Sequence, residues 1–126
     1  MQIDTSNSEN PLVDLGHNIR AVEEAGLGHG YLIWNEGRWC INLDSPNDST
    51  YKNKEYPDSK LLAKNMVEYL NDQMLPAPQK IGVISVNNWN NSNGASIQWQ
   101  SGQTVYEIGS KDPMTALKLA AAMKFK

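Results

Sequence analysis

The sequence predicts an α+β fold: a single antiparallel sheet of five strands with three helices mostly on one face, in the order αββαβββα. Three observations support this prediction. Segments in which apolar residues recur with helical spacing are separated by groups of strand-like segments. The strand-like segments follow one another through short turns rich in Asn and Gly, which favour antiparallel pairing. Apolar and polar residues alternate along most of these segments, so only one face of the sheet needs a covering layer.

The size and composition of the chain suit one independently folding unit. It has 126 residues, of which 40% are hydrophobic and 20% are charged, and a chain of this length can bury a core of its own. Residues 1–9 are polar and are expected to form a flexible N-terminal tail. Residues 10–126 are expected to form a single α+β domain.

A first helix is predicted from Asn10 to about Gly26. Asn10 and Pro11 have the residue types of an N-cap followed by the first helical position. Gly26 is placed as the left-handed residue that ends the helix, with Leu27 folding back onto it. The apolar residues between these ends recur at intervals of three and four: Leu12, Leu15, Ile19 and Val22.

The middle of the chain predicts a hairpin and a second helix. Residues 30–44 contain two aromatic and β-branched runs around a turn at Asn35-Glu36-Gly37. Residues 45–57 form a polar loop, after which Asp58 caps a helix that extends to about Asn71.

The last third predicts three more strands and a helix. The strand-like runs are residues 81–86, 95–100 and 104–109. Asp112-Pro113 then has the residue types of another helix start, and the alanine-rich segment that follows favours a helix.

Strand phase separates an apolar face from a polar one, and the polar face is the main candidate for binding. Amides, a hydroxyl and an arginine on ordered strands can form the polar part of a protein-binding surface. The alternation also places Cys40, Val105 and Glu107 on this face. The predicted partner-binding residues of the face are Arg38, Asn42, Ser96, Gln98 and Gln100.

Three aromatic residues outside the strand interiors are further candidates. Tyr51 and Tyr56 belong to the long 45–57 loop, and long loops often carry function. Trp89 follows the predicted strand 81–86 within a run of asparagines, where it could act as a stacking platform for a sugar or a nucleobase.

Charge and residue usage argue against several classes of function. A formal charge of −3 offers no basic footprint for nucleic acid. Neither a metal site nor a catalytic constellation is recognisable around the single cysteine and two histidines, so we expect a protein that is not an enzyme and needs no cofactor. The N-terminus lacks a secretory pattern and no run is long enough to span a membrane, which predicts a cytoplasmic protein without membrane contact.

The end of the chain resembles NinX-type small proteins of lambdoid phages. The resemblance rests on Tyr106-Glu107-Ile108-Gly109 followed by Lys111-Asp112-Pro113-Met114-Thr115-Ala116-Leu117-Lys118. In those proteins a strand closes with glycine, and an acidic or hydroxyl residue plus proline opens an alanine-rich last helix. The resemblance implies a product of a phage or another mobile element.

Together these observations predict a small accessory protein that binds another protein. We expect it to inhibit a host enzyme or defence complex, in the manner of anti-CRISPR or anti-restriction proteins. Two alternatives remain open: a cytosolic immunity protein that neutralises a cognate toxin, and a small glycan- or nucleotide-binding module that uses Trp89 and neighbouring amides. The sequence also leaves open whether the chain forms a homodimer.

Overall fold

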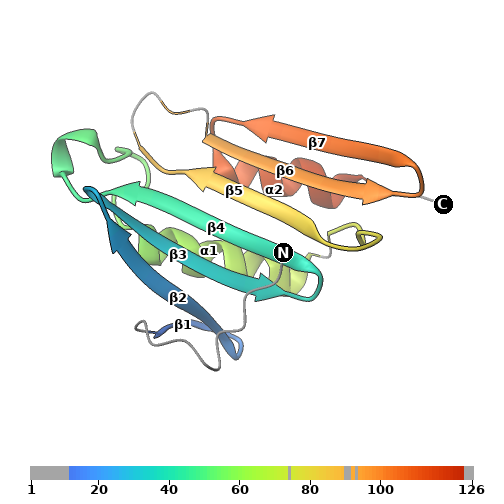
Figure 1. Ribbon diagram of the computed structural model, residues 1–126, viewed down its shortest axis with the longest axis horizontal. Helices are drawn as coiled ribbons and strands as arrows, with labels where there is room; N and C mark the ends of the chain where they lie inside the picture. The colour runs from blue at the N-terminus through green and yellow to red at the C-terminus, as the bar shows by residue number, and fades with distance from the viewer. Residues whose placement is uncertain (1–11, 74, 90–91, 93, 124–126) are drawn as a thin grey trace.

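The protein folds into one seven-stranded sheet with two α-helices on one side, over the residues that the computed structural model describes: 12–73, 75–89, 92 and 94–123 (Figure 1). The strands lie in the sheet in the same order as in the chain. The elements are β1 (Leu12–Gly16), β2 (Ile19–Gly26), β3 (His29–Glu36), β4 (Trp39–Pro46), the 3₁₀ turn η1 (Ser49–Tyr51), α1 (Ser59–Asp72), β5 (Gly82–Asn87), β6 (Gly94–Ser101), β7 (Thr104–Ser110) and α2 (Pro113–Ala122).

The predicted five-stranded antiparallel sheet with three helices is wrong, although the α+β class is correct. The difference lies first in residues 12–26, which form the hairpin β1–β2 where a helix was expected. Asn10 and Pro11, its predicted start, lie outside the described residues, as does the predicted tail 1–9.

Two-residue turns explain why this segment forms strands. His17 and Asn18 have φ angles of 51° and 63°, and Leu27 and Gly28 have 50° and 81°. Positive φ at both central residues is the geometry of tight hairpin turns whose twist matches that of the flanking strands. The helical spacing of the apolar residues is therefore coincidental: Leu15 joins the core beneath the helices, whereas Val22 belongs to the opposite face.

The sheet is mixed because β4 and β5 run parallel, with Ile41 beside Ile84, while every other neighbouring pair is antiparallel. Residues 47–81, including α1, connect these two strands. A parallel pair needs such a long crossover, usually a helix. β5 lies in the sheet interior between β4 and β6.

The remaining predicted elements are confirmed within a few residues of their expected bounds. The hairpin β3–β4 turns at Gly37 and Arg38, just after the expected position. Asp58 caps α1 by accepting hydrogen bonds from the backbone N–H groups of Lys60 and Leu61. Asp112 and Pro113 begin α2 as predicted, and Lys124 and Lys126 lie outside the described residues.

Both helices cover the same face of the sheet, with α1 against β1 and β4 and α2 against β6 and β7 (Figure 1). A row of buried side chains crosses the sheet beneath them, since strand register aligns one apolar residue from each of five strands. The helices contribute Leu62, Met66 and Leu117 to the same core. The row consists of Trp34, Ile41, Ile84, Ile97 and the partly buried Ile108.

Candidate functional site

The face of the sheet opposite the helices is called the open face here. Among the described residues, no helix or strand packs over it. Strand register defines its members, because residues that are paired across neighbouring strands point to the same side. They are Leu12 and Asp14 (β1), Arg20, Val22, Glu24 and Gly26 (β2), His29, Tyr31, Ile33 and Asn35 (β3), Cys40, Asn42, Asp44 and Pro46 (β4), Val83, Ser85 and Asn87 (β5), Gly94, Ser96, Gln98 and Gln100 (β6), and Val105, Glu107 and Gly109 (β7).

Four of the predicted partner-binding residues lie together on the open face: Asn42, Ser96, Gln98 and Gln100. Three of them, Asn42, Gln98 and Gln100, are exposed, and Ser96 is half-buried. The Gln98 amide donates a hydrogen bond to the Glu107 carboxylate on β7, and that of Gln100 donates to the Gly102 carbonyl, 3.0 Å away. The centre of this face therefore presents ordered amide groups.

Cys40 is buried although it lies on the open face, with only 4% of its surface exposed. Burial raises the pKa of its thiol above the ordinary value. The neutral thiol is therefore favoured over the thiolate, which is the nucleophilic form.

Arg38 lies at the end of the sheet, in the turn between β3 and β4, rather than on a strand. Its guanidinium donates hydrogen bonds to the carbonyls of Pro78 (3.3 Å) and Gln79 (3.0 Å), and its own carbonyl accepts from the Gly82 N–H at 2.9 Å. The side chain thus holds the segment that leads into β5, which is a structural role.

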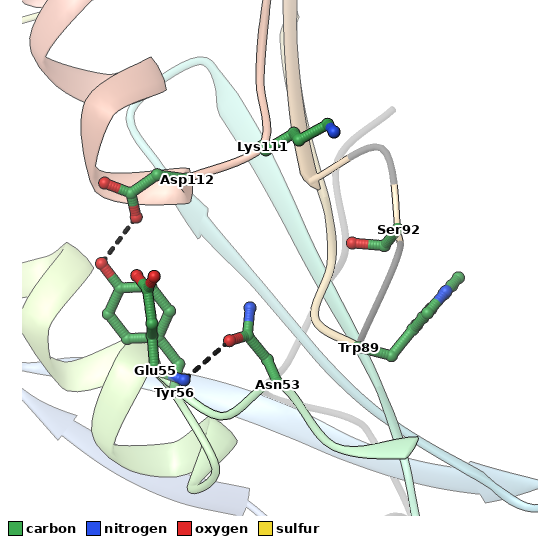
Figure 2. A pocket seen from close by; sticks show the side chains of 7 residues that line it. All are labelled: Asn53, Glu55, Tyr56, Trp89, Ser92, Lys111 and Asp112. Carbon is green, nitrogen blue, oxygen red and sulfur yellow. Dashed lines mark hydrogen bonds between the residues drawn. The ribbon is translucent and has the colours of Figure 1, made fainter.

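Trp89 and Tyr56 line one small pocket between the 45–58 loop, the connection after β5 and the start of α2. Its volume of about 250 Å³ is below the usual range for ligand pockets. Figure 2 shows Trp89 on the far side of the pocket from the Tyr56–Asp112 pair. The lining residues are Asn53, Glu55, Tyr56, Trp89, Ser92, Lys111 and Asp112.

The Tyr56–Asp112 pair is an ordered polar contact in this pocket. The Tyr56 hydroxyl donates to Asp112 Oδ1 at 2.6 Å, and Thr115 Oγ1 donates to Asp112 Oδ2 at 2.6 Å (Figure 2). Burial and the neighbouring carboxylate raise the pKa of Tyr56 to about 12. Burial alone would raise the pKa of Asp112, but the hydrogen bonds from Thr115 and Tyr56 outweigh it and lower that pKa.

Buried Asn88 fixes the loop that carries Tyr56. Its side-chain amide donates to the Tyr56 carbonyl at 2.9 Å, and its backbone N–H donates to the Asp44 carbonyl at 2.8 Å. Tyr51, by contrast, is 61% exposed in η1 and does not line the pocket. The structure therefore brings Tyr56 and Trp89 together and leaves Tyr51 apart from them.

An aromatic and acidic cluster at one end of the open face did not emerge from sequence reasoning. His29 Nδ1 lies 2.8 Å from Asp44 Oδ1. The His29 ring stacks with Tyr31 at 6.2 Å between centroids and meets Trp89 edge-on at 5.6 Å. The register of the β3–β4 hairpin could have predicted the Tyr31–Asp44 part of this cluster, because a two-residue turn at Gly37-Arg38 pairs Tyr31 with Asp44.

The described part of the chain contains no group of three or more His, Cys, Asp or Glu residues placed to hold a metal ion. Nor does any helix in that part have the length and apolar character needed to cross a membrane.

No model of a protein family matches the chain, and comparisons with curated proteins and with solved structures gave no match either. The NinX resemblance at the C-terminus stays a prediction.

Proposed function

We propose that this protein acts by binding another protein through its open face, as a cytoplasmic accessory protein of a phage or mobile element. Its proposed effect is to inhibit a host enzyme or defence complex. The observation that carries the proposal is the separation of the sheet into two faces. One face is closed by both helices, whereas the other presents exposed Asn42, Gln98 and Gln100 on ordered strands.

The chemistry of the open face supports binding of a protein. Protein interfaces combine apolar contacts with roughly one hydrogen bond per 100–200 Å² of buried area. The amides of this face can donate and accept such bonds. Exposed apolar side chains are interspersed among them, namely Leu12, Val83 and Val105. The rigid strands also reduce the conformational entropy lost on binding.

The state of Cys40 supports binding rather than covalent catalysis. Its thiol is buried and its pKa is raised. A nucleophilic cysteine instead needs an accessible thiolate with a lowered pKa.

Two double variants, one with arginines on the open face and one with arginines on the helix side, test the proposal. The Asn42→Arg, Gln98→Arg variant alters the open face, and Asn65→Arg, Gln73→Arg makes the same chemical change at exposed positions of α1 and its C-terminal end. We expect the first variant to lose stoichiometric retention of a protein from host lysate and the control to keep it. Equal retention by both variants would contradict the proposal. Identifying the retained protein distinguishes a host target from a cognate toxin.

The pocket beside Trp89 supports a second candidate function, the binding of a sugar or nucleobase. Trp89 there adjoins amide, hydroxyl and charged side chains from Asn53, Ser92 and Lys111. The other three tryptophans are buried, so a ligand at this pocket should act mainly on Trp89 fluorescence. A ligand panel that quenches the native protein but not Trp89→Phe would support this function, and no quenching by any ligand would reject it.

A further inference from the structure

The charged side chains of the open face are mostly acidic. Acids occur on both edge strands and in the middle of the sheet, and Arg20, opposite Asp14, is the one Lys or Arg residue on this face among the described residues. The acids are Asp14, Glu24, Asp44 and Glu107.

These residues account for the net charge of the whole chain. Four carboxylates against one guanidinium give the open face a formal charge of −3, and the complete sequence also has a formal charge of −3. In the rest of the sequence, acidic residues are therefore equal in number to Lys and Arg residues. The helix-covered side has mixed charges, such as Lys60 beside Glu23 at 3.3 Å.

The aromatic cluster provides a second, independent observation at the Asp44 end of this face. Tyr31 lies directly opposite Asp44 on the neighbouring strand, and the His29 ring stacks with Tyr31 and meets the Trp89 ring edge-on. Aromatic faces beside a carboxylate suit a guanidinium group, which stacks on rings and donates to carboxylate oxygens. Such aromatic positions often act as anchor points in protein interfaces.

Building on the proposed function, we propose that the partner presents a basic protein surface with an arginine that docks beside Asp44, Tyr31 and Trp89. Glu24 and Glu107 attract further basic groups of the same surface toward β2 and β7. Complementary charge of this kind steers encounter and excludes wrong partners. A nucleic acid does not fit the face, because its phosphates would meet carboxylates.

The test uses defined peptides rather than the cellular partner. An octapeptide of alternating arginine and glycine is titrated into the ¹⁵N-labelled protein, and amide chemical shifts are recorded; an octapeptide of alternating glutamate and glycine is the matched probe. We expect shift changes for the arginine peptide at Asp44, Glu107 and their open-face neighbours. Affinity should fall about tenfold between about 25 mM and about 300 mM NaCl, because salt screens exposed charges.

Two double variants test whether the arginine peptide binds the acids of the open face or any exposed acid of the protein. Glu24→Gln with Glu107→Gln should weaken binding of the arginine peptide by about threefold or more, since two exposed charge contacts are lost. Glu68→Gln with Asp72→Asn removes two exposed acids of α1, on the helix side of the sheet, and should leave the affinity unchanged. Trp89→Ala should reduce the shift changes at the Asp44 end.

The proposal is overturned if the shift changes map to α1 or α2, if the glutamate peptide binds equally well, or if both paired variants behave alike. Failure of this inference is distinguishable from failure of the proposed function. If partner retention depends on Asn42 and Gln98 but the arginine peptide leaves the face unperturbed, protein binding stands and the basic-partner inference is rejected. If the peptide binds there but no retained protein depends on Asn42 and Gln98, the proposed function fails instead.

Discussion

The two faces of the sheet are built from the same strands but differ in what their side chains do. In β5, Ile84 and Val86 are buried beneath the helices, whereas their neighbours Val83 and Ser85 are exposed on the open face. Alternation along a strand makes this division possible, because successive side chains point to opposite faces. Stability and the proposed binding surface are thus assigned to different residues of one strand.

Among the described residues, the open face has no large exposed apolar patch, although none of their helices or strands packs over it. Its exposed apolar side chains Leu12, Val83 and Val105 lie on β1, β5 and β7, which are separated by other strands. Amides and carboxylates lie between them. Scattered apolar residues are normal on a monomer, whereas contiguous patches promote association. The face is therefore suited to a specific partner with polar groups more than to nonspecific adhesion.

The largest expected difference between the faces is in the free energy of unfolding. Ile84→Ala removes a fully buried side chain beneath the helices and should cost about 3 kcal/mol through lost burial and a residual cavity. Val83→Ala, one residue away at 36% exposure, should cost less than about 1 kcal/mol. Urea unfolding followed by tryptophan fluorescence measures both. Similar losses would show that the open face contributes to the core.

Two glycines provide a matched comparison with a somewhat smaller effect. A methyl group at Gly82, on the covered face, would lie 2.4 Å from the Trp39 ring, so Gly82→Ala should cost about 2 kcal/mol through overpacking. A methyl group at Gly109, on the open face, would lie 3.8 Å from the Ala95 carbonyl oxygen, an ordinary van der Waals distance, so Gly109→Ala should change stability by less than about 0.5 kcal/mol. Thermal unfolding of both variants checks the contrast, and a destabilised Gly109→Ala would refute it.

Local signals made much of this division predictable from sequence. Asp58 and the Asp112-Pro113 pair identified both helix starts, because capping depends on residues close together in the chain. Alternation placed Asn42 and Gln98 on the polar face, since side-chain direction follows strand phase. These features need no knowledge of distant contacts.

The predictions that were wrong or missing concern features that depend on pairing between segments distant in the sequence. Leu15 and Val22 have helical spacing, and only the His17-Asn18 turn reveals that they belong to different strands and different faces. The parallel pairing of β4 with β5 follows from where α1 returns the chain, which composition does not specify. In the same way, the contact between Trp89 and His29 joins the segment after β5 to the start of β3.

A hydrogen bond on each side of the sheet extends the comparison to polar contacts. Tyr56→Phe removes the hydroxyl that joins the segment before α1 to the start of α2, and should cost about 1 kcal/mol near neutral pH. Gln98→Ala removes an exposed contact to Glu107 on the open face and should cost less than about 0.5 kcal/mol. Urea unfolding of the two variants measures the difference.

The pH dependence of stability identifies the Tyr56 contribution separately. Folding raises the pKa of Tyr56 from its unfolded value of about 10 to about 12. The unfolded chain therefore loses this proton first, so the stabilisation is complete below about pH 10 and is lost as the pH rises toward about 12. Tyr56→Phe should remove this part of the alkaline decline. An unchanged difference between native protein and variant across that range would show that folding does not raise the pKa of Tyr56.

The smallest expected effect is at the rim, where the hairpin β1–β2 meets α1. His17 Nε2 lies 2.8 Å from Glu68 Oε2, but the two side chains are 37% and 68% exposed, so solvent screens the pair. A double-mutant cycle of His17→Ala and Glu68→Ala should give a coupling energy below about 0.5 kcal/mol. The hairpin should instead be held by burial of Leu15 and Ala21 beneath the helices. A coupling energy above about 1 kcal/mol would show that this edge of the covered face depends on charge more than on apolar packing.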